Sequence, residues 1–213
     1  MRTSFIFLFA LFLAETIQAQ RTRNVAWYIP SSCATNRING LAIGPICGAF
    51  QCDGSDVPES QCVNGIQLEL LGQGFVPPIL YFNYEAWEAY LGDVPFEHKI
   101  NGIVISLGGY AGLGKVVNGI NLSGLNTETS RINGLSTGLI FCFNQRVNGI
   151  SIGGINLTDT TNGVQVGLLN TSENKLNGLQ IGLFNKAKNL KGVQIGLWNK
   201  SDKRALPLLN FQF

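Results

Sequence analysis

Apolar and polar residues alternate in short segments that recur along the chain. Seven of the nine segments begin with an apolar residue and an Asn-Gly pair, as in Ile100-Asn101-Gly102 and Leu176-Asn177-Gly178; the exceptions are Thr161-Asn162-Gly163 and Leu190-Lys191-Gly192. After the glycine, the first, third and fifth positions are mostly aliphatic, the second is usually polar and the fourth is small. This period of two predicts one β-strand per segment, with its Leu, Ile and Val side chains turned towards the protein interior.

The segment recurs nine times, and from Asn101 to Lys191 the steps are 14 to 17 residues long. The first two steps are longer, and we interpret them as one unit each with insertions at about residues 47–62 and 73–99. Asn-Gly favours a tight turn, so each pair predicts a corner. A second asparagine after most strands predicts another corner, at Asn126, Asn156, Asn170, Asn185 and Asn199.

A unit of about 15 residues cannot bury its own apolar face, so the units must stack on one another. We predict an all-β fold, a β-solenoid of about nine 14–15-residue units, because coils that run in the same direction place identical motifs in ladders. The C-terminal segment, with Leu209, Phe211 and Phe213 on one face, is expected to cap the last coil. The alternative is a small up-and-down outer-membrane β-barrel, which a terminal phenylalanine after alternating apolar residues would also suit.

Three units carry the most regular form of the motif: NGVQVGLLN from Asn162, NGLQIGLFN from Asn177 and KGVQIGLWN from Lys191. They resemble short bacterial surface-repeat proteins with a G-[VL]-Q-[IV]-G-L-x-N motif, which occur among exported proteins of spirochaetes and Bacteroidetes-type bacteria. The resemblance is specific over residues 147–213 and weaker before them. It implies export and surface exposure, and it implies no known activity.

Residues 1–19 have the pattern of a secretory signal peptide, with Arg2 before the apolar run from Phe5 to Ala14 and the small residue Ala19 at the expected cleavage point. The prediction is therefore an exported protein, at the cell surface, in the outer membrane or extracellular, with residues 20–213 as a single repeat domain. Export permits disulfides. Four cysteines, Cys33, Cys47, Cys52 and Cys62, are candidates for two bridges whose pairing the sequence does not choose; small buried thiols are the alternative.

Composition limits the chemistry that this chain can perform. The formal charge is +2, which gives no broad basic footprint for nucleic acid, and a single histidine leaves few routes to a metal centre. We expect no cofactor, no metal site and no catalysis.

The insertion at 73–99 is the least repetitive region and the strongest sequence candidate for ligand binding. It holds aromatic and acidic residues that could bind a glycan, a peptide or a cation, chiefly Tyr84, Glu85, Trp87, Glu88 and His98. The alternative is that these aromatic residues pack back on the repeats as a cap. The expected function is a structural or binding role towards an unknown surface ligand, glycan or protein, with possible outer-membrane association. A pore or adhesion barrel, and a glycan-processing enzyme that uses this insertion, are the two alternatives.

Overall fold

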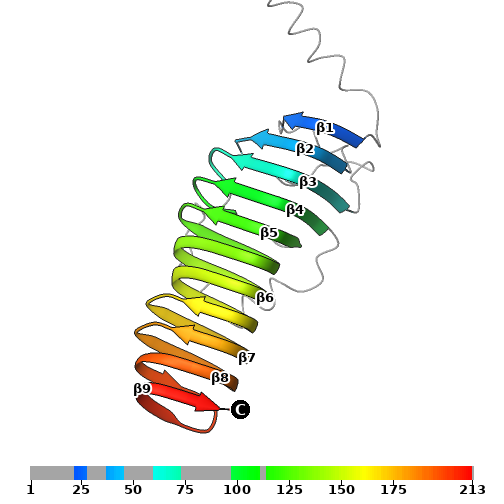
Figure 1. Ribbon diagram of the computed structural model, residues 1–213. Coiled ribbons are helices and arrows are strands. Elements are labelled where there is room, and N and C mark those ends of the chain that lie inside the picture. Colours follow the sequence, from blue (N-terminus) through cyan, green and yellow to red (C-terminus); the bar gives the residue numbers. More distant parts are fainter. Residues whose placement is uncertain (1–21, 28–36, 46–59, 73–96, 111–113, 213) are drawn as a thin grey trace, which may run out of the picture.

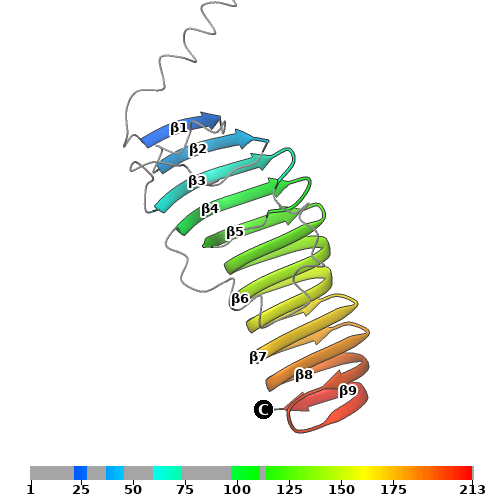
Figure 2. The same ribbon diagram turned by 180° about the vertical axis from the view of Figure 1, so that it is seen from behind.

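The computed structural model describes residues 22–27, 37–45, 60–72, 97–110 and 114–212. These residues form nine strands in one sheet, in the order of the sequence (Figures 1 and 2). The strands are β1 (Thr22–Trp27), β2 (Arg37–Gly44), β3 (Ser60–Glu69), β4 (Glu97–Ser106), β5 (Lys115–Ser123), β6 (Asn126–Val166), β7 (Leu169–Ile181), β8 (Phe184–Lys200) and β9 (Ala205–Gln212). From β6 to β8 the chain winds continuously, so one strand assignment spans more than one side of the coil.

The fold is the predicted β-solenoid. From β1 to β8 each strand pairs in parallel with the next, which excludes the up-and-down barrel, whose neighbouring strands are antiparallel. The Asn-Gly motifs stack in register: Asn39 pairs with Asn64, and Asn64 with Asn101. The two long steps in the sequence therefore join ordinary neighbouring layers, as the interpretation of one unit plus an insertion requires.

The Asn-Gly pair does not form a corner, contrary to the sequence-based prediction. It lies inside the strand, and its glycine has a φ between 138° and 147° in every described unit. A Cβ on Gly178 would stand 2.0 Å from the carbonyl oxygen of Gly163 in the layer before it. Glycine is thus required for two reasons, the positive φ and the close stacking of backbone on backbone.

The bend that was predicted at the second asparagine does exist. The chain turns between β6 and β7 at Gly167 and Leu168, immediately before the buried Asn170. Asn156, Asn170 and Asn185 each donate one bond to a backbone carbonyl and another to the next asparagine. The amide of Asn170, for example, reaches Ile181 O at 2.9 Å and Asn185 Oδ1 at 2.8 Å. This asparagine ladder fixes the corner from inside.

The direction of the aliphatic face is the main departure from the sequence-based prediction. The polar residue at the second position after the glycine is fully buried, as at Gln165, Gln180 and Gln194, whereas the aliphatic residues on either side of it face outward. The prediction that the Leu, Ile and Val face is turned inward is therefore wrong. At Gln165, Gln180 and Gln194 the buried amides bond to one another from layer to layer, which offsets the cost of burying them.

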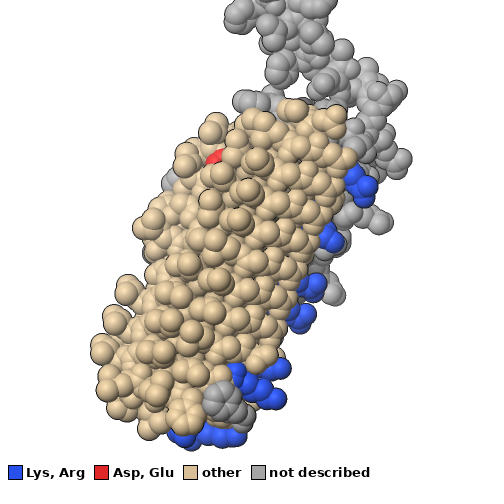
Figure 3. Space-filling view, viewed as in Figure 1, with Lys and Arg blue, Asp and Glu red and all other residues tan. Residues whose placement is uncertain are grey.

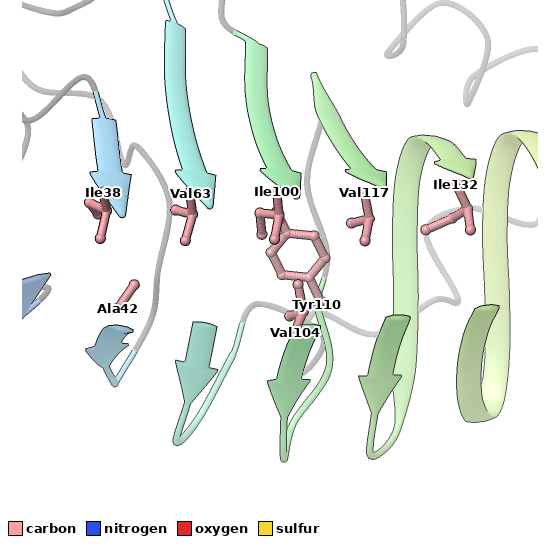
Figure 4. Packing of buried hydrophobic residues seen from close by; sticks show 8 residues of the cluster. All are labelled: Ile38, Ala42, Val63, Ile100, Val104, Tyr110, Val117 and Ile132. Carbon is pink, nitrogen blue, oxygen red and sulfur yellow. The ribbon is translucent and has the colours of Figure 1, made fainter. Parts of the chain in front are cut away.

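Apolar residues do line part of the interior, one position before each Asn-Gly. Ile38, Val63, Ile100, Val117 and Ile132 come from successive strands and are all fully buried. Figure 4 shows them in a row along the coil axis, with Tyr110 and Val104 across from them. The same column stays aliphatic in most C-terminal layers, at Val147, Leu176 and Leu190, so the interior combines one aliphatic column with columns of amides and hydroxyls.

The C-terminal segment is a cap, as predicted, but with its faces reversed. Strand β9 pairs antiparallel with β8 and covers its free edge. Asn210 points inward and donates to Gln194 Oε1 at 2.9 Å, while Leu209 and Phe211 are about half exposed. The cap therefore continues the amide interior and the apolar exterior of the layers before it. Phe213 lies outside the described residues.

Candidate binding face

Large aliphatic side chains cover one long side of the solenoid and its bend. We define the apolar face as the exposed side chains at the first, third, fifth and sixth positions after the motif glycine. They are Ile66, Leu70, Leu71, Ile105, Leu107, Ile120, Leu122, Leu139, Ile140, Ile150, Ile152, Leu168, Leu169, Ile181, Leu183, Phe184, Ile195, Leu197 and Trp198. Leu139 is 77% exposed and Leu168 is 59% exposed. Soluble proteins rarely leave a continuous apolar surface of this kind without a partner, so it is the strongest candidate for a binding surface.

A groove runs along this face where the chain bends. It has a volume of about 920 Å³ and lies between the third-position column (Ile152, Val166, Ile181, Ile195) and the fifth-position column (Leu139, Leu168, Leu183, Leu197). Its floor is glycine backbone, and Leu208 of β9 stands at one end.

The floor must be glycine because a side chain would have no room. A Cβ on Gly182 would lie 2.3 Å from Gly167 O and 2.5 Å from the amide nitrogen of Asn170. The asparagine ladder inside the corner and the groove outside it thus have the same physical origin, the close approach of successive backbones.

Basic residues line the opposite edge of the same face. We define the basic row as Arg37, Lys99, Arg131, Arg146 and Lys175, each two residues before the motif asparagine. Figure 3 shows Lys and Arg along the edge where the strands begin and at the lower end, and almost no charge elsewhere on that side. The charge and the aliphatic surface are therefore separated along the length of each strand, with the basic residue at its start and the leucine at the bend.

A second cluster, of buried titratable groups, lies inside the N-terminal half. His98 of β4 is 1% exposed and packs edge-on against Tyr110, with ring centroids 6.3 Å apart. Lys115, its register partner in β5, places its ammonium 4.1 Å from the Tyr110 ring centroid. Burial, and to a lesser extent the neighbouring Lys115 charge, lowers the pKa of His98 to about 3, so the imidazole is neutral at physiological pH.

The predicted binding residues are only in part described by the structure. Tyr84, Glu85, Trp87 and Glu88 lie outside the described residues. His98 is described, and its imidazole is enclosed in the interior, where a surface ligand would not reach it.

The predicted disulfides fall largely outside the described part as well. Cys33, Cys47 and Cys52 are not among the described residues, and Cys62 is a free, half-buried cysteine in β3. Cys142 is also free, and it is fully buried at the corner, where its Sγ lies 3.4 Å from Ile152 O. It occupies the place that Asn156 and Asn170 hold in the following layers.

Sequence reasoning missed the basic row and gave the apolar face the wrong direction. The signal for the row was present as a fixed spacing, since a Lys or Arg precedes the motif by the same number of residues in five units. The signal for the direction of the apolar face was the residue type at the second position after the motif glycine. Amides at that position can hydrogen-bond along a stack of layers, which aliphatic side chains cannot do.

Among the described residues, no three His, Cys, Asp or Glu side chains are placed to hold a metal ion. The described part also contains no helix that is long and apolar enough to cross a membrane. Comparison with family models, curated proteins and solved structures finds no match to this chain.

Proposed function

We propose that this chain is an exported bacterial surface-repeat protein whose solenoid is a non-catalytic binding scaffold, and that the apolar face is its binding surface. The observation that carries the proposal is the exposure of large aliphatic side chains in register over successive layers, with Leu168, Leu183 and Leu197 each between 43% and 59% exposed. Isolated exposed leucines are ordinary, but an unbroken array of them favours a partner that removes the surface from water.

The interior supports a scaffold role. Buried polar side chains in the C-terminal layers bond to one another from layer to layer, as Asn185 does to Asn199 at 2.7 Å, and do not converge on an open cavity. The groove on the apolar face is lined by Gly, Ile, Val and Leu with Ser123 and Thr137 at one end, which is a lining for apolar contact.

Binding is tested with an environment-sensitive apolar dye and with mild detergent, using the exported form of the chain. The expected result is dye fluorescence that falls strongly in the double variant Leu168→Ser, Leu183→Ser. The matched control is the double variant Thr171→Ser, Lys188→Ser. Both residues follow a corner asparagine and lie outside the apolar face, so this variant should leave the dye signal unchanged. Equal dye binding by both double variants would contradict a binding role for the apolar face.

Export is tested separately by expressing residues 1–213 in a Gram-negative host and measuring the intact mass of the product in each cell fraction. Export with cleavage after Ala19 gives a product that begins at Gln20 in the envelope or the medium. A full-length product that stays in the cytoplasm would reject this part of the proposal and would leave the binding surface untouched.

A further inference from the structure

The apolar face and the basic row form a surface that has two chemically different edges. In the layers from Ile132 to Trp198, no Asp, Glu, Lys or Arg occupies any of the six positions after the motif glycine. The charged residues of these layers lie on the other positions of the coil, among them Arg131, Arg146 and Lys175 at the strand starts. In these layers the strand from the motif glycine to the corner is thus uncharged, and the edge at the strand starts carries the basic row.

Both edges belong to the same side of the sheet. Burial alternates through each strand, so that in β6 Arg131 is exposed, Ile132 is buried and Asn133 is half-buried. The first aliphatic residue on the outward side of this layer, Leu135, follows Arg131 by four residues, a distance of about 13 Å along a strand. The fifth-position leucines lie further on, at the bend.

Two members of the basic row, Arg131 and Arg146, lie in neighbouring layers, and the others are separated by uncharged residues such as Val116. Asn148 donates to Asn133 Oδ1 at 2.7 Å, which places the two layers in register and sets Arg146 directly after Arg131. Successive layers are about 4.8 Å apart, a spacing at which like charges that face one another destabilise a sheet. The column that holds these residues continues through Thr160, Lys175 and Asn189 and contains no acidic residue. An anionic partner along the row would relieve the repulsion between Arg131 and Arg146 and would also pair with Lys99 and Lys175.

We propose that this side of the solenoid is a membrane-docking surface, which lays its apolar corner into the outer part of a bilayer and its basic row against anionic lipid headgroups. The proposal rests on the proposed function and names its partner. Interfacial amphipathic helices bury their apolar face about 5–10 Å into the boundary between headgroups and acyl chains, and Lys and Arg side chains extend along the surface to keep their charged ends in the polar layer. The spacing of about 13 Å between the row and the first aliphatic column suits such a depth once the long basic side chains are included.

The aromatic residues of the corner fit the same orientation. Phe184 is 51% exposed and Trp198 is 48% exposed, and they occupy the same position in two neighbouring layers. Trp is favoured where an apolar body and a polar N–H meet the interfacial region of a bilayer. Trp198 is therefore a reporter for the depth of the corner.

A second copy of the chain fits this surface less well than a bilayer does. Face-to-face pairing about a two-fold axis along the coil would lay each basic row over the partner's apolar corner, whereas an axis across the coil would set row against row. In neither arrangement does an opposite charge meet Arg131 or Arg146. The charge distribution thus favours an anionic sheet of lipid over self-association.

The test is flotation of the exported form of the chain with vesicles of phosphatidylcholine alone or mixed equally with phosphatidylglycerol. We expect binding to the anionic vesicles that is at least tenfold tighter, and that weakens as salt is raised. The double variant Arg131→Gln, Arg146→Gln should lose about thirtyfold in affinity for anionic vesicles, since each basic residue near such a surface contributes about fivefold. The control Lys186→Gln, Lys188→Gln removes the same charge from exposed positions beyond the corner, and should lose less than threefold by the same reasoning.

Depth is measured by the quenching of Trp fluorescence with lipids brominated on the acyl chain. The double variant Trp27→Phe, Trp87→Phe leaves Trp198 as the remaining Trp, and its fluorescence should be strongly quenched. Circular dichroism confirms that each variant keeps its β content.

Several results would overturn the proposal. Equal affinity for neutral and anionic vesicles would reject the role of the basic row. So would equal losses of affinity in Arg131→Gln, Arg146→Gln and in the control Lys186→Gln, Lys188→Gln. Dye binding to the apolar face without any vesicle binding would reject the bilayer and retain the proposed function. A concentration-dependent dimer that Leu168→Ser, Leu183→Ser dissociates would replace the bilayer by a second copy.

Discussion

The side-chain amide of Gln180 donates to Oε1 of Gln165 at 2.6 Å, and this bond joins two neighbouring layers of the solenoid. Gln194 donates to Gln180 in the same way at 2.8 Å, and Asn210 of the cap donates to Gln194. These four side chains are fully buried. They form a line of amides along the axis in which each layer supplies a partner for the next, so the interior is held by directional bonds.

The first prediction compares the two faces of one strand. Gln180→Leu removes a partner from both neighbouring amides, and leaving a buried polar group underbonded costs roughly 1–3 kcal/mol. Ile181→Gln, which changes a half-exposed outer position, should cost less than about 0.5 kcal/mol. Urea unfolding followed by circular dichroism measures both. A larger loss for Ile181→Gln would mean that the aliphatic side is the interior.

The second prediction concerns the motif glycine. Gly178 has a φ of 144°, and its Cβ would meet the carbonyl of Gly163 at 2.0 Å. Gly178→Ala should therefore destabilise the solenoid by about 3 kcal/mol or more, from backbone strain and from forced separation of two layers. Lys188→Ala, at an exposed position, is the control and should shift the urea midpoint little. A Gly178→Ala protein as stable as the parent would refute the close stacking.

The third prediction concerns pH. The folded-state pKa of His98 is about 3, and an unfolded histidine has a pKa of about 6.5, so the unfolded chain binds a proton that the folded chain does not. The resulting stability is fully present above pH 6.5 and falls as the pH is lowered towards 3, by up to about 1.4 kcal/mol per pH unit.

The pH effect is isolated by the difference between the parent and His98→Gln, measured as Tm from pH 8 to pH 4. We expect the parent to lose stability more steeply than the variant below pH 6.5. Parallel curves would show that His98 titrates in the folded protein as it does in the unfolded one.

The fourth prediction concerns the thiol of Cys142. Burial raises the pKa of Cys142 to about 12, so at pH 8 almost no thiolate is present, and the thiolate is the reactive form. Alkylation with iodoacetamide at pH 8, followed by peptide mapping, should leave Cys142 unmodified in the folded protein and fully modified in urea. Rapid labelling of the folded protein would indicate that the corner opens.

The sequence alone was sufficient for the repeat and its stacking. The spacing of the Asn-Gly pairs required units that cannot fold singly, and identical motifs in each unit favoured parallel coils, which the pairing of Asn64 with Asn101 and of Asn101 with Asn118 confirms. It did not reveal β1. In that strand Arg23 and Val25 pair with Ile38 and Leu41, so the layer has one residue fewer where the motif glycine would be, and the motif search could not find it.

The tertiary structure alone decided which side of each strand is the interior. A period of two defines two faces but gives neither of them a direction, and the usual assumption places the aliphatic one inside. In this solenoid the two sides of the coil are close together, and the side chains that fill the space are those that bond to their copies one layer away, such as Gln165, Gln180 and Gln194. The aliphatic residues that alternate with these amides are left on the surface, while the aliphatic residue before each motif asparagine stays inside. The bonding of stacked amides is a property of the assembled layers and of no single unit.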